Sequence, residues 1–323
     1  MWRYRNKRVR EVAMGAVVFV VTVLHFLYMA SYALDFLGPT MSPAAYVFYA
    51  TANAYACSAV INIHRLRHRF NTRHRIVVLV SEDVSPEYLD LFAGLNATVL
   101  HQTPPQLPDG GSYYYKDCLL KLVAFKMHLL DPTVQRLLVL DSDQLIVRNI
   151  DFMLDRRLTD DVAAPSAYWL APGTLASTCM LIQPNPTLWE EVEGAINTTS
   201  AQHYDMDIFN DLFAHRARRL SGSYVTLNSH WEDRTVPTWF TTDRNVTFPA
   251  DAWARDASDD ELDELYNNQT DILHYTAVGK PWMWSTEQTK LKRPDAHPVL
   301  FHQWSQWRIL ASELCPNGFI SVI

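Results

Sequence analysis

Two acidic side chains stand two residues apart directly after an apolar run, in Arg136-Leu-Leu-Val-Leu-Asp141-Ser142-Asp143. The run predicts a buried strand, and ligands bind at the edge of an open parallel sheet where such strands end. Carboxylates this close repel each other unless a cation lies between them or they retain their protons. Oxygen ligands with open positions suit Mg²⁺ or Mn²⁺ bound to a diphosphate. The segment therefore predicts a metal that links protein carboxylates to the phosphates of a nucleotide.

The Asp-x-Asp spacing by itself carries little information, because the chain holds a second such pair at Asp205 and Asp207. A pair of this kind can also lie in a solvated loop. The buried strand that precedes Asp141 favours metal ligation over that alternative.

A histidine and a lysine six residues apart form the second candidate group, in His274-Tyr-Thr-Ala-Val-Gly-Lys280-Pro281-Trp282. A neutral imidazole could supply a third ligand to the metal. The ammonium group could stabilise a diphosphate leaving group as its negative charge grows. Without the carboxylate pair, this segment would be interpreted as structural, because lone histidines and lysines are usually packed or solvated.

Strands and helices that alternate along the first half are expected to position these groups. Apolar runs predict strands at 46–50, 76–80, 97–100 and 136–140. Helical patterns follow the first strand, through Ala59, Ile63 and Leu66, and cover 86–95 and 119–130. This alternation indicates an α/β unit with a mostly parallel, buried sheet.

The second half alternates less regularly. We expect a strand at 178–183, helices at 187–196 and 207–219, and an acidic, solvated stretch at 256–271. Of four tryptophans near the C-terminus, most are expected to pack in the core: Trp282, Trp284, Trp304 and Trp307.

An apolar segment near the N-terminus, residues 12–34, contains no Asp, Glu, Lys or Arg. At about 1.5 Å per residue it is long enough to cross a hydrocarbon core of about 30 Å. Basic residues precede it and none cluster after it. The positive-inside rule therefore predicts a cytoplasmic tail at 1–11, a transmembrane signal anchor at 12–34, a short linker at 35–44 and a lumenal catalytic domain at 45–323. A cleaved signal peptide is the alternative, but the apolar core of such peptides runs only about 7–15 residues.

The predicted compartment is the lumen of the endoplasmic reticulum or Golgi, with the protein as a single-pass type II membrane protein. Four Asn-x-Ser/Thr sequons lie beyond the apolar segment, at Asn96, Asn197, Asn245 and Asn268. In that compartment the four cysteines could form disulfides, although the sequence leaves the pairing open.

Composition excludes several classes of protein. With 28 Lys+Arg against 35 Asp+Glu, the net charge of −7 makes the surface a poor binder of nucleic acid. The cysteines lie far apart without metal-ligand spacing, which excludes a zinc-cluster protein and a small disulfide scaffold.

Five motifs occur in a fixed order along residues 45–284. They are Tyr49-Ala-Thr-Ala-Asn53-Ala-Tyr55-Ala, Lys121-Leu122, Leu140-Asp-Ser-Asp143 followed by Asn149-Ile150-Asp151, the segment from Asp205 to Asn210, and the segment from His274 to Trp282. In order and spacing this set resembles glycosyltransferase family 8, the glycogenin-like group. The resemblance implies a GT-A nucleotide-diphospho-sugar transferase fold, with a mostly parallel central sheet flanked by helices. It also implies a retaining hexosyltransferase that uses a UDP-sugar with Mn²⁺ or Mg²⁺.

The resemblance further implies a role for individual residues. The metal ligands would be Asp141, Asp143 and His274. The groups that bind the donor would be Thr51, Asn53 and Tyr55 at the uridine, Ser142 beside the metal ligands and Lys280 at the diphosphate. Lys121 and Asp205 would be the catalytic residues beside the transferred sugar. Asp207 and Asn210 would lie on the acceptor side.

The chain departs from the family pattern at three places. Ala176-Ser177-Thr178 replaces the usual Asn-x-Gly, Met206 replaces a glutamine, and Ala277 replaces a glycine. These changes leave the metal ligands intact and concern the choice of sugar. They are more similar to the membrane-anchored fungal branch, which includes N-acetylglucosaminyltransferases, than to glycogenin. The predicted reaction moves N-acetylglucosamine or glucose to a hydroxyl of a glycan, lipid or protein, with galactose and glucuronic acid still open.

Two alternatives come from other classes of protein. A phosphatase of the haloacid-dehalogenase type also has Asp-x-Asp after a buried strand, with the first Asp as nucleophile. That pattern usually has Thr or Val two residues after the second Asp, where this chain has Leu145. The other alternative is a membrane-anchored sugar-binding protein with an inactive site. For the transferase, the sequence does not decide whether Asp205 attacks covalently or stabilises a front-face transition state.

Overall fold

The computed structural model describes residues 23, 43–112, 115–155, 159–240, 253–316 and 319. All of them except Val23 belong to the unit Ser42–Ile323. The predicted tail and anchor, apart from Val23, and the linker up to residue 42 lie outside the described residues. Among the residues that are described, no helix has both the length and the hydrophobicity needed to cross a membrane.

The central sheet has seven strands in the order β3-β2-β1-β4-β7-β6-β8. Their bounds are β1 Ala44–Ala50, β2 Arg75–Val80, β3 Thr98–His101, β4 Arg136–Leu140, β6 Val162–Pro165, β7 Cys179–Ile182 and β8 Arg218–Leu220. The pairs β1–β2, β1–β4, β2–β3 and β6–β8 are parallel, whereas β7 runs antiparallel to both of its neighbours. The predicted strands and the mostly parallel sheet are therefore confirmed.

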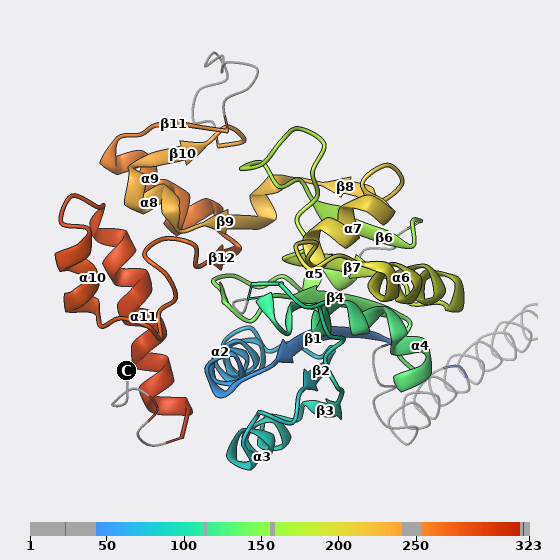
Figure 1. Cartoon of the computed structure of the whole chain (residues 1–323). Helices are drawn as coiled ribbons and strands as arrows, with labels where there is room; N and C mark the ends of the chain where they lie inside the picture. The colour runs from blue at the N-terminus through green and yellow to red at the C-terminus, as the bar shows by residue number, and fades with distance from the viewer. Residues whose placement is uncertain are drawn as a thin grey trace, which may run out of the picture. The chain divides into compact units, whose positions relative to one another are not determined.

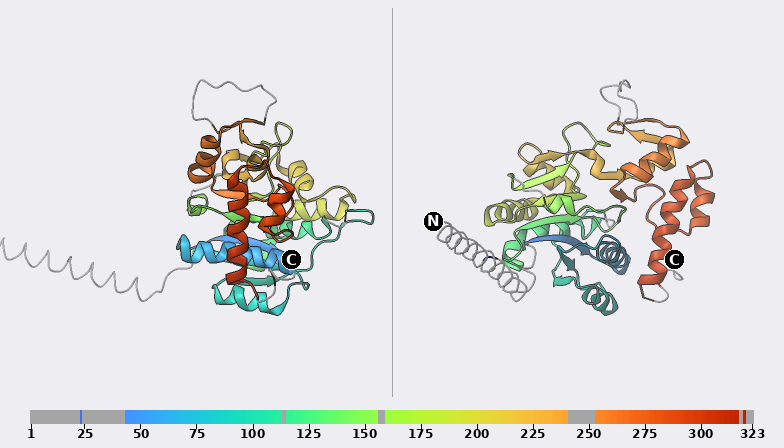
Figure 2. Two further views of the ribbon diagram at one scale, coloured as in Figure 1. Left: turned by 90° about the vertical axis from the view of Figure 1, so that its left-hand side faces the viewer. Right: turned by 180° about the vertical axis from the view of Figure 1, so that it is seen from behind.

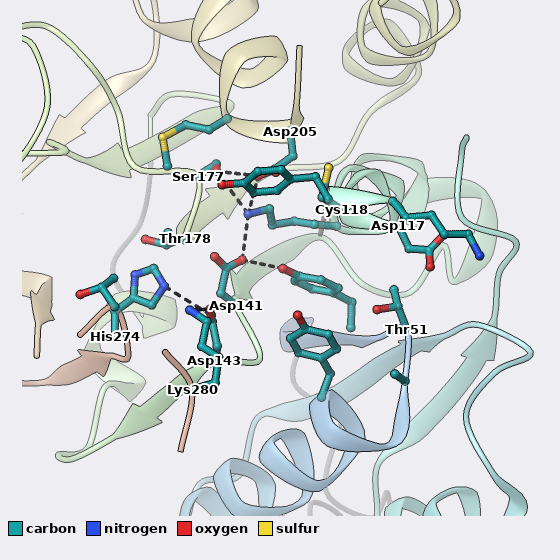
Figure 3. A pocket seen from close by; sticks show the side chains of 18 of the residues that line it. Thr51, Asp117, Cys118, Asp141, Asp143, Ser177, Thr178, Asp205, His274 and Lys280 are labelled. Carbon is teal, nitrogen blue, oxygen red and sulfur yellow. Dashed lines mark hydrogen bonds and ion pairs between the residues drawn. The ribbon is translucent and has the colours of Figure 1, made fainter. Parts of the chain in front are cut away.

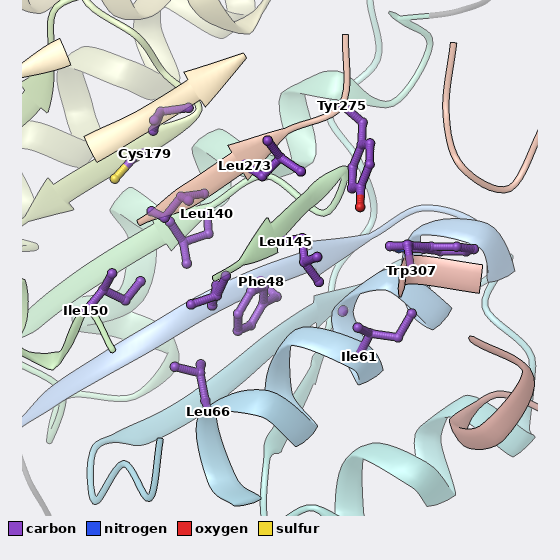
Figure 4. Close-up of a cluster of buried hydrophobic side chains, with 14 of the residues drawn as sticks. Phe48, Ile61, Leu66, Leu140, Leu145, Ile150, Cys179, Leu273, Tyr275 and Trp307 are labelled. Atoms are coloured by element: carbon purple, nitrogen blue, oxygen red, sulfur yellow. The ribbon is translucent and has the colours of Figure 1, made fainter. Parts of the chain in front are cut away.

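Helices cover both faces of this sheet (Figure 1). They are α2 Asn53–His64 with a π turn at Arg65–Arg69, α3 Pro86–Gly94, a 3₁₀ segment at Cys118–Lys126 that continues as α4 Met127–Leu130, α5 Asp151–Asp155, α6 Pro186–Thr198 and α7 Asp205–Phe213. Alternate residues of β1 enter different cores. Phe48 lies in one core beside Ile61 of α2 (Figure 4), and Tyr46 belongs to the same core. Ala45 and Val47 lie in the other core with the 3₁₀ segment and α6.

A smaller sheet extends the edge at which β1 and β4 end. Its strands are β5 Gln144–Ile146, β12 Ile272–His274 and β9 Val225–Leu227, in the order β5-β12-β9. A two-stranded ribbon of β10 Thr235–Pro237 and β11 Ala254–Asp256 lies beyond it. The remaining elements are a 3₁₀ turn Gly222–Tyr224, α8 Ser229–Asp233, α9 Asp259–Glu264 with a π turn at Leu265–Gln269, α10 Thr286–Lys292 and α11 Pro298–Leu314.

The C-terminal helix α11 crosses α2 (Figure 2). A disulfide between Cys57 in α2 and Cys315 at the end of α11 joins the two helices. Cys118 and Cys179 are free thiols. Trp304 and Trp307 of α11 are fully buried, which confirms the packing role predicted for them. Trp282 and Trp284 are partly buried and pack against the same core.

Three predicted elements differ from the structure. The segment 118–126 is a 3₁₀ helix rather than the start of an α-helix, because an apolar run buried on all sides does not distinguish a period of 3.0 from one of 3.6. The helix predicted at 207–219 spans 205–213, and Arg218–Leu220 pairs with β6 as an edge strand. The acidic stretch 256–271 is solvated on one side only, since Leu262 and Leu265 on its other side are fully buried.

Candidate active site

The ends of β4 and β12 bring the predicted metal ligands together. Asp141 follows β4, and Asp143 lies one residue before β5. The antiparallel register of β5 and β12 places His274 opposite Gln144, and the Tyr275 amide donates to the Asp143 carbonyl at 3.1 Å. Asp141, Asp143 and His274 can each offer one ligand atom such that all three lie within 4.8 Å of one another (Figure 3).

Asp141 shares one of its oxygens with two donors. The Tyr49 hydroxyl donates to Oδ1 at 2.9 Å, and Lys121 Nζ donates to the same oxygen at 2.8 Å. The other oxygen, Oδ2, takes part in neither contact. Burial raises the pKa of Asp141, and the Lys121 ammonium offsets part of that rise.

Asp143 is flanked by two nitrogen groups. Lys280 Nζ lies 2.5 Å from Oδ2, and His274 Nε2 lies 3.4 Å from Oδ1. Burial alone would raise the pKa of Asp143, but the neighbouring Lys280 and His274 outweigh burial and lower it. Asp143 is therefore held in its ionised form.

Lys121 connects the metal group to the catalytic carboxylate predicted at Asp205. Its Nζ lies 2.6 Å from Asp205 Oδ2 as well as 2.8 Å from Asp141 Oδ1. Burial would lower the pKa of Lys121, but the two carboxylates raise it, so the ammonium stays charged. The Ser177 hydroxyl donates to Asp205 Oδ2 at 2.9 Å.

A free thiol, Cys118, also lines this region. Burial, and then the nearby Asp205, raise the pKa of the Cys118 thiol to about 12, so that thiol is protonated and unreactive.

These groups line one cavity of about 840 Å³. Most of the predicted site residues are among its walls: Thr51, Tyr55, Lys121, Asp141, Asp143, Asp205, His274 and Lys280. The metal group and Lys280 form one side, Asp205 lies above Asp141, and Thr51 lies on the side of α2 (Figure 3). Lys121 contacts both Asp141 and Asp205. A cavity of this size can hold a nucleotide sugar.

Two residues predicted to bind the donor make hydrogen bonds to the backbone. Asn53 Oδ1 accepts a hydrogen bond from the Ser85 amide at 2.9 Å, which fixes the loop before α3. Ser142 is 1% exposed, and its hydroxyl donates to the Tyr49 carbonyl. Neither side chain lines the cavity.

The two residues predicted on the acceptor side also hold local structure. The Asp207 carboxylate accepts from the Tyr204 amide and so caps the start of α7. The Asn210 side chain accepts from the Leu175 amide at 2.7 Å and donates to the Leu175 carbonyl at 2.9 Å. Asn210 therefore fixes the backbone at Leu175, two residues before Ser177.

The donor set fits a divalent cation. Two carboxylates and an imidazole can bind Mn²⁺ or Mg²⁺. In each carboxylate the lysine contacts one oxygen, and the second oxygen could bind the cation. The buried His274 Nδ1 has no hydrogen-bond partner among the described residues. With a neutral imidazole, the charged side chains that line the cavity leave a formal net charge of −2: Asp83, Asp117, Asp141, Asp143 and Asp205 against Lys116, Lys121 and Lys280. A divalent cation would neutralise this charge, and the cation itself would attract a diphosphate.

Comparison with known sequences gives two relatives of low identity. The chain is 26% identical over 270 residues to "Glucose N-acetyltransferase 1" of Gibberella zeae, covering 78% of this chain and 56% of that protein. It is 25% identical over 238 residues to the protein of the same name from Aspergillus fumigatus, covering 62% and 58%. The chain thus spans little more than half the length of these relatives. No protein-family model matches it.

Comparison with solved structures decides the fold. The galactosyltransferase LgtC, solved with donor and acceptor sugar analogues, superposes with a TM-score of 0.57 at 17% identity, over 86% of this chain and all of LgtC. The bifunctional glycosyltransferase WbbM gives 0.57 at 14% identity, over 88% of this chain and 52% of WbbM. GlyE of Streptococcus pneumoniae gives 0.52 at 16% identity, over 84% and 62%. The fold is the GT-A glycosyltransferase fold.

The GT-A fold explains why some cavity residues were missed in the sequence. Tyr49 lies two residues after Val47, on the same face of β1, and so faces the 3₁₀ segment that carries Lys121. Its position in the first motif was available as a signal. Ser177 and Thr178 meet Asp141 only because β7 pairs antiparallel with β4, with Asp141 N donating to the Thr178 carbonyl at 3.2 Å. No local pattern indicates that pairing.

One departure from the family pattern has a structural explanation. Ala277, which replaces a glycine, does not have a positive φ angle; the left-handed residues of this turn are Val278 (φ 59°) and Gly279 (φ 102°). The backbone at 277 therefore accepts any side chain that fits, and the alanine leaves the turn intact.

Proposed function

We propose that this protein is a retaining glycosyltransferase that moves a sugar from a UDP-sugar to an acceptor hydroxyl and depends on Mn²⁺ or Mg²⁺. The observation that carries the proposal is the shared cavity of the metal-capable group and the Lys121–Asp205 pair. One side of this cavity suits a diphosphate, and the other places a carboxylate where a sugar would lie. The GT-A fold supports the same class of reaction.

Charge decides the role of each side chain. Asp141, Asp143 and His274 would hold the cation, which supplies positive charge to the diphosphate when bound. Lys280 lies 2.5 Å from Asp143 and so stands beside the cation's position, where it stabilises the departing diphosphate as negative charge grows. Asp205 stabilises the positive charge that develops on the sugar in a front-face reaction. Its ion pair with Lys121 makes it a weak nucleophile, which favours this role over covalent attack.

Thr51 and Tyr55 border the uridine in this proposal, because they line the cavity at the start of α2. The transferred sugar is N-acetylglucosamine or glucose, and the acceptor is a glycan, lipid or protein. The resemblance to family 8, and to its membrane-anchored fungal branch, supports this choice.

The name shared by the two relatives favours a second candidate, which is acetyl transfer to glucose. The paired carboxylates, imidazole and lysine of this cavity suit a diphosphate donor better than an acetyl donor. The haloacid-dehalogenase type of phosphatase gains no support, because the fold is that of the GT-A transferases.

The proposed location is the lumen of the endoplasmic reticulum or Golgi, with residues 12–34 as the anchor. The Cys57–Cys315 disulfide supports an oxidising compartment. Three sequon asparagines, Asn96, Asn197 and Asn268, are exposed, as an attached glycan requires.

The test is a donor panel with the purified full-length protein. UDP-sugars and acetyl-CoA are supplied with glucose and glycan acceptors, with Mn²⁺ or with a chelator. We expect turnover of one UDP-sugar that chelation abolishes, and we expect Asp143→Ala to lose it while Asp90→Ala, at an exposed surface carboxylate, keeps it. Transfer from acetyl-CoA alone would establish the second candidate. Absence of both metal-dependent UDP binding and turnover would indicate an inactive site and refute the proposal.

A further inference from the structure

The turn that carries Lys280 holds an unfavourable backbone conformation. Val278 has φ 59°, in the left-handed region that β-branched residues rarely enter, and Gly279 follows at φ 102°. Such a conformation persists only where surrounding contacts impose it. The origin of the constraint is therefore to be found among the groups that touch residues 275–284.

Two elements supply the main contacts: Asn228 Oδ1 accepts from the amides of Thr276 at 2.7 Å and Ala277 at 2.8 Å, and helix α11 holds the residues on the other side of Lys280. Arg308 donates from one nitrogen to the carbonyls of Pro281 at 3.1 Å and Trp284 at 3.0 Å. Trp304 Nε1 donates to the same Trp284 carbonyl at 2.9 Å. On the other side of the turn, the buried Tyr275 hydroxyl donates to the Gln303 carbonyl of α11 at 2.9 Å.

The constraint reaches the ammonium group of Lys280. Met283 N donates to the Lys280 carbonyl at 2.8 Å, which closes the turn that Arg308 holds from outside. Lys280 Nζ donates to the Tyr275 carbonyl at 2.6 Å and to Asp143. Residues of α11 thus contact the segments that hold both ends of this lysine. Arg308 holds the backbone that follows Lys280, and Gln303 holds Tyr275, whose carbonyl accepts from the ammonium group.

Helix α11 is itself fixed to the element that borders the other end of the cavity. The disulfide Cys57–Cys315 joins it to α2, and Trp307 Nε1 donates to Ser58 Oγ at 3.2 Å. Trp282 packs between Trp307 and Tyr55, with ring centroids 5.6 and 5.3 Å apart. The helix therefore connects the start of α2 with the Lys280 turn.

We propose that Arg308 is a positioning residue for the diphosphate of the donor: it holds the Pro281–Trp284 backbone so that Lys280 stays over Asp143, and the Cys57–Cys315 disulfide keeps α11 where Arg308 can do this. The inference rests on the proposed function, which assigns Lys280 to the diphosphate. Arg308 touches no substrate in this scheme. Its effect is confined to ligands that carry phosphate.

The experiment measures binding of UDP and of uridine to the purified full-length protein in Mn²⁺, by calorimetry. We expect Arg308→Met to weaken UDP binding by about tenfold, as for one impaired charge-assisted contact, and to leave uridine binding unchanged. Arg308→Lys should recover part of the UDP affinity. Arg216→Met removes an exposed arginine that pairs with Glu191 far from the turn, and should change neither ligand.

A second arm tests the connection through the disulfide. Cys57→Ser with Cys315→Ser should weaken UDP binding selectively as well, and Arg308→Met should add less than tenfold in that background, because both changes release the same turn. Equal loss of UDP and uridine binding, or unchanged UDP binding in folded Arg308→Met and Arg308→Lys proteins, would overturn the inference. Failure of the wild-type protein to bind UDP with Mn²⁺ would instead overturn the proposed function.

Discussion

Lys121 and Asp205 form an ion pair inside the cavity wall, with Nζ 2.6 Å from Oδ2 and the lysine side chain 3% exposed. The same ammonium lies 2.8 Å from Asp141, so one cation compensates two buried carboxylates. The partners are therefore not equivalent. Removal of the lysine leaves two acids unpaired, whereas removal of Asp205 leaves the lysine paired with Asp141.

This asymmetry predicts unequal losses of stability. Lys121→Met should lower the free energy of unfolding by about 3–5 kcal/mol, the range for breaking a buried pair from one side. Asp205→Asn should cost less than half as much. Denaturant unfolding of both variants, with Asp90→Asn as the control at an exposed carboxylate, measures the difference. Equal losses would show that Lys121 does not serve both acids.

The sequence predicts the first half of the fold well because each strand there is a continuous apolar run. It also places Asp141 correctly, since residues that follow a buried parallel strand reach the ligand-binding edge. The approach of His274 depends on the three-residue strands β5 and β12. Strands this short give no periodic signal. Residue type made His274 a possible third ligand, and the family resemblance assigned it to this metal.

The contacts of Asn53 and Ser142 have a common physical basis. Both side chains satisfy backbone groups of neighbouring segments, a serine hydroxyl at the Tyr49 carbonyl and an amide oxygen at the Ser85 amide. Small polar residues beside a ligand site serve backbone and ligand equally well, and residue type does not distinguish these roles. The groups that surround the side chain in the folded protein determine which of the two it contacts.

The Cys57–Cys315 disulfide is expected to contribute strongly to stability. It closes a loop with a sequence separation of 258 residues and joins two helices that pack on each other. Long loops lose the most chain entropy on closure, so Cys57→Ser with Cys315→Ser should cost about 2–4 kcal/mol. Thermal unfolding with and without a reductant checks this. A reductant that lowers the wild-type midpoint but not that of the double variant would attribute the effect to this bond.

Three exposed sequons predict a glycosylated protein if the domain is lumenal. Asn96 lies in the turn before β3, Asn197 near the end of α6 and Asn268 in the π turn after α9. None of the three lines the cavity, so glycans there would leave it open. Protein from eukaryotic cells should shift on a gel after glycosidase treatment, and the shift should shrink with each Asn→Gln change. An unshifted wild-type protein would contradict the lumenal location.

His230 is buried, and we expect its burial to lower the free energy of unfolding in mild acid. His230 is fully buried; its Nε2 lies 3.0 Å from the Tyr168 hydroxyl and its Nδ1 lies 3.1 Å from Thr235 Oγ1. Burial lowers its pKa to about 3, below the value of about 6.5 expected in the unfolded chain. The unfolded state therefore binds a proton that the folded state rejects. Stability from this group is complete above pH 6.5 and falls as the pH drops towards 3, by about 1.4 kcal/mol per pH unit.

The measurement compares wild-type protein with His230→Gln, whose amide can still hydrogen-bond to both neighbours. The variant should lose less stability than the wild type between pH 7 and 5, by about 2 kcal/mol over that interval. His297, whose burial also lowers its pKa, stays in both proteins and cancels in the difference. Denaturant midpoints at a series of pH values give the two curves. Parallel curves would show that His230 is protonated in the folded protein and that its burial does not govern its charge.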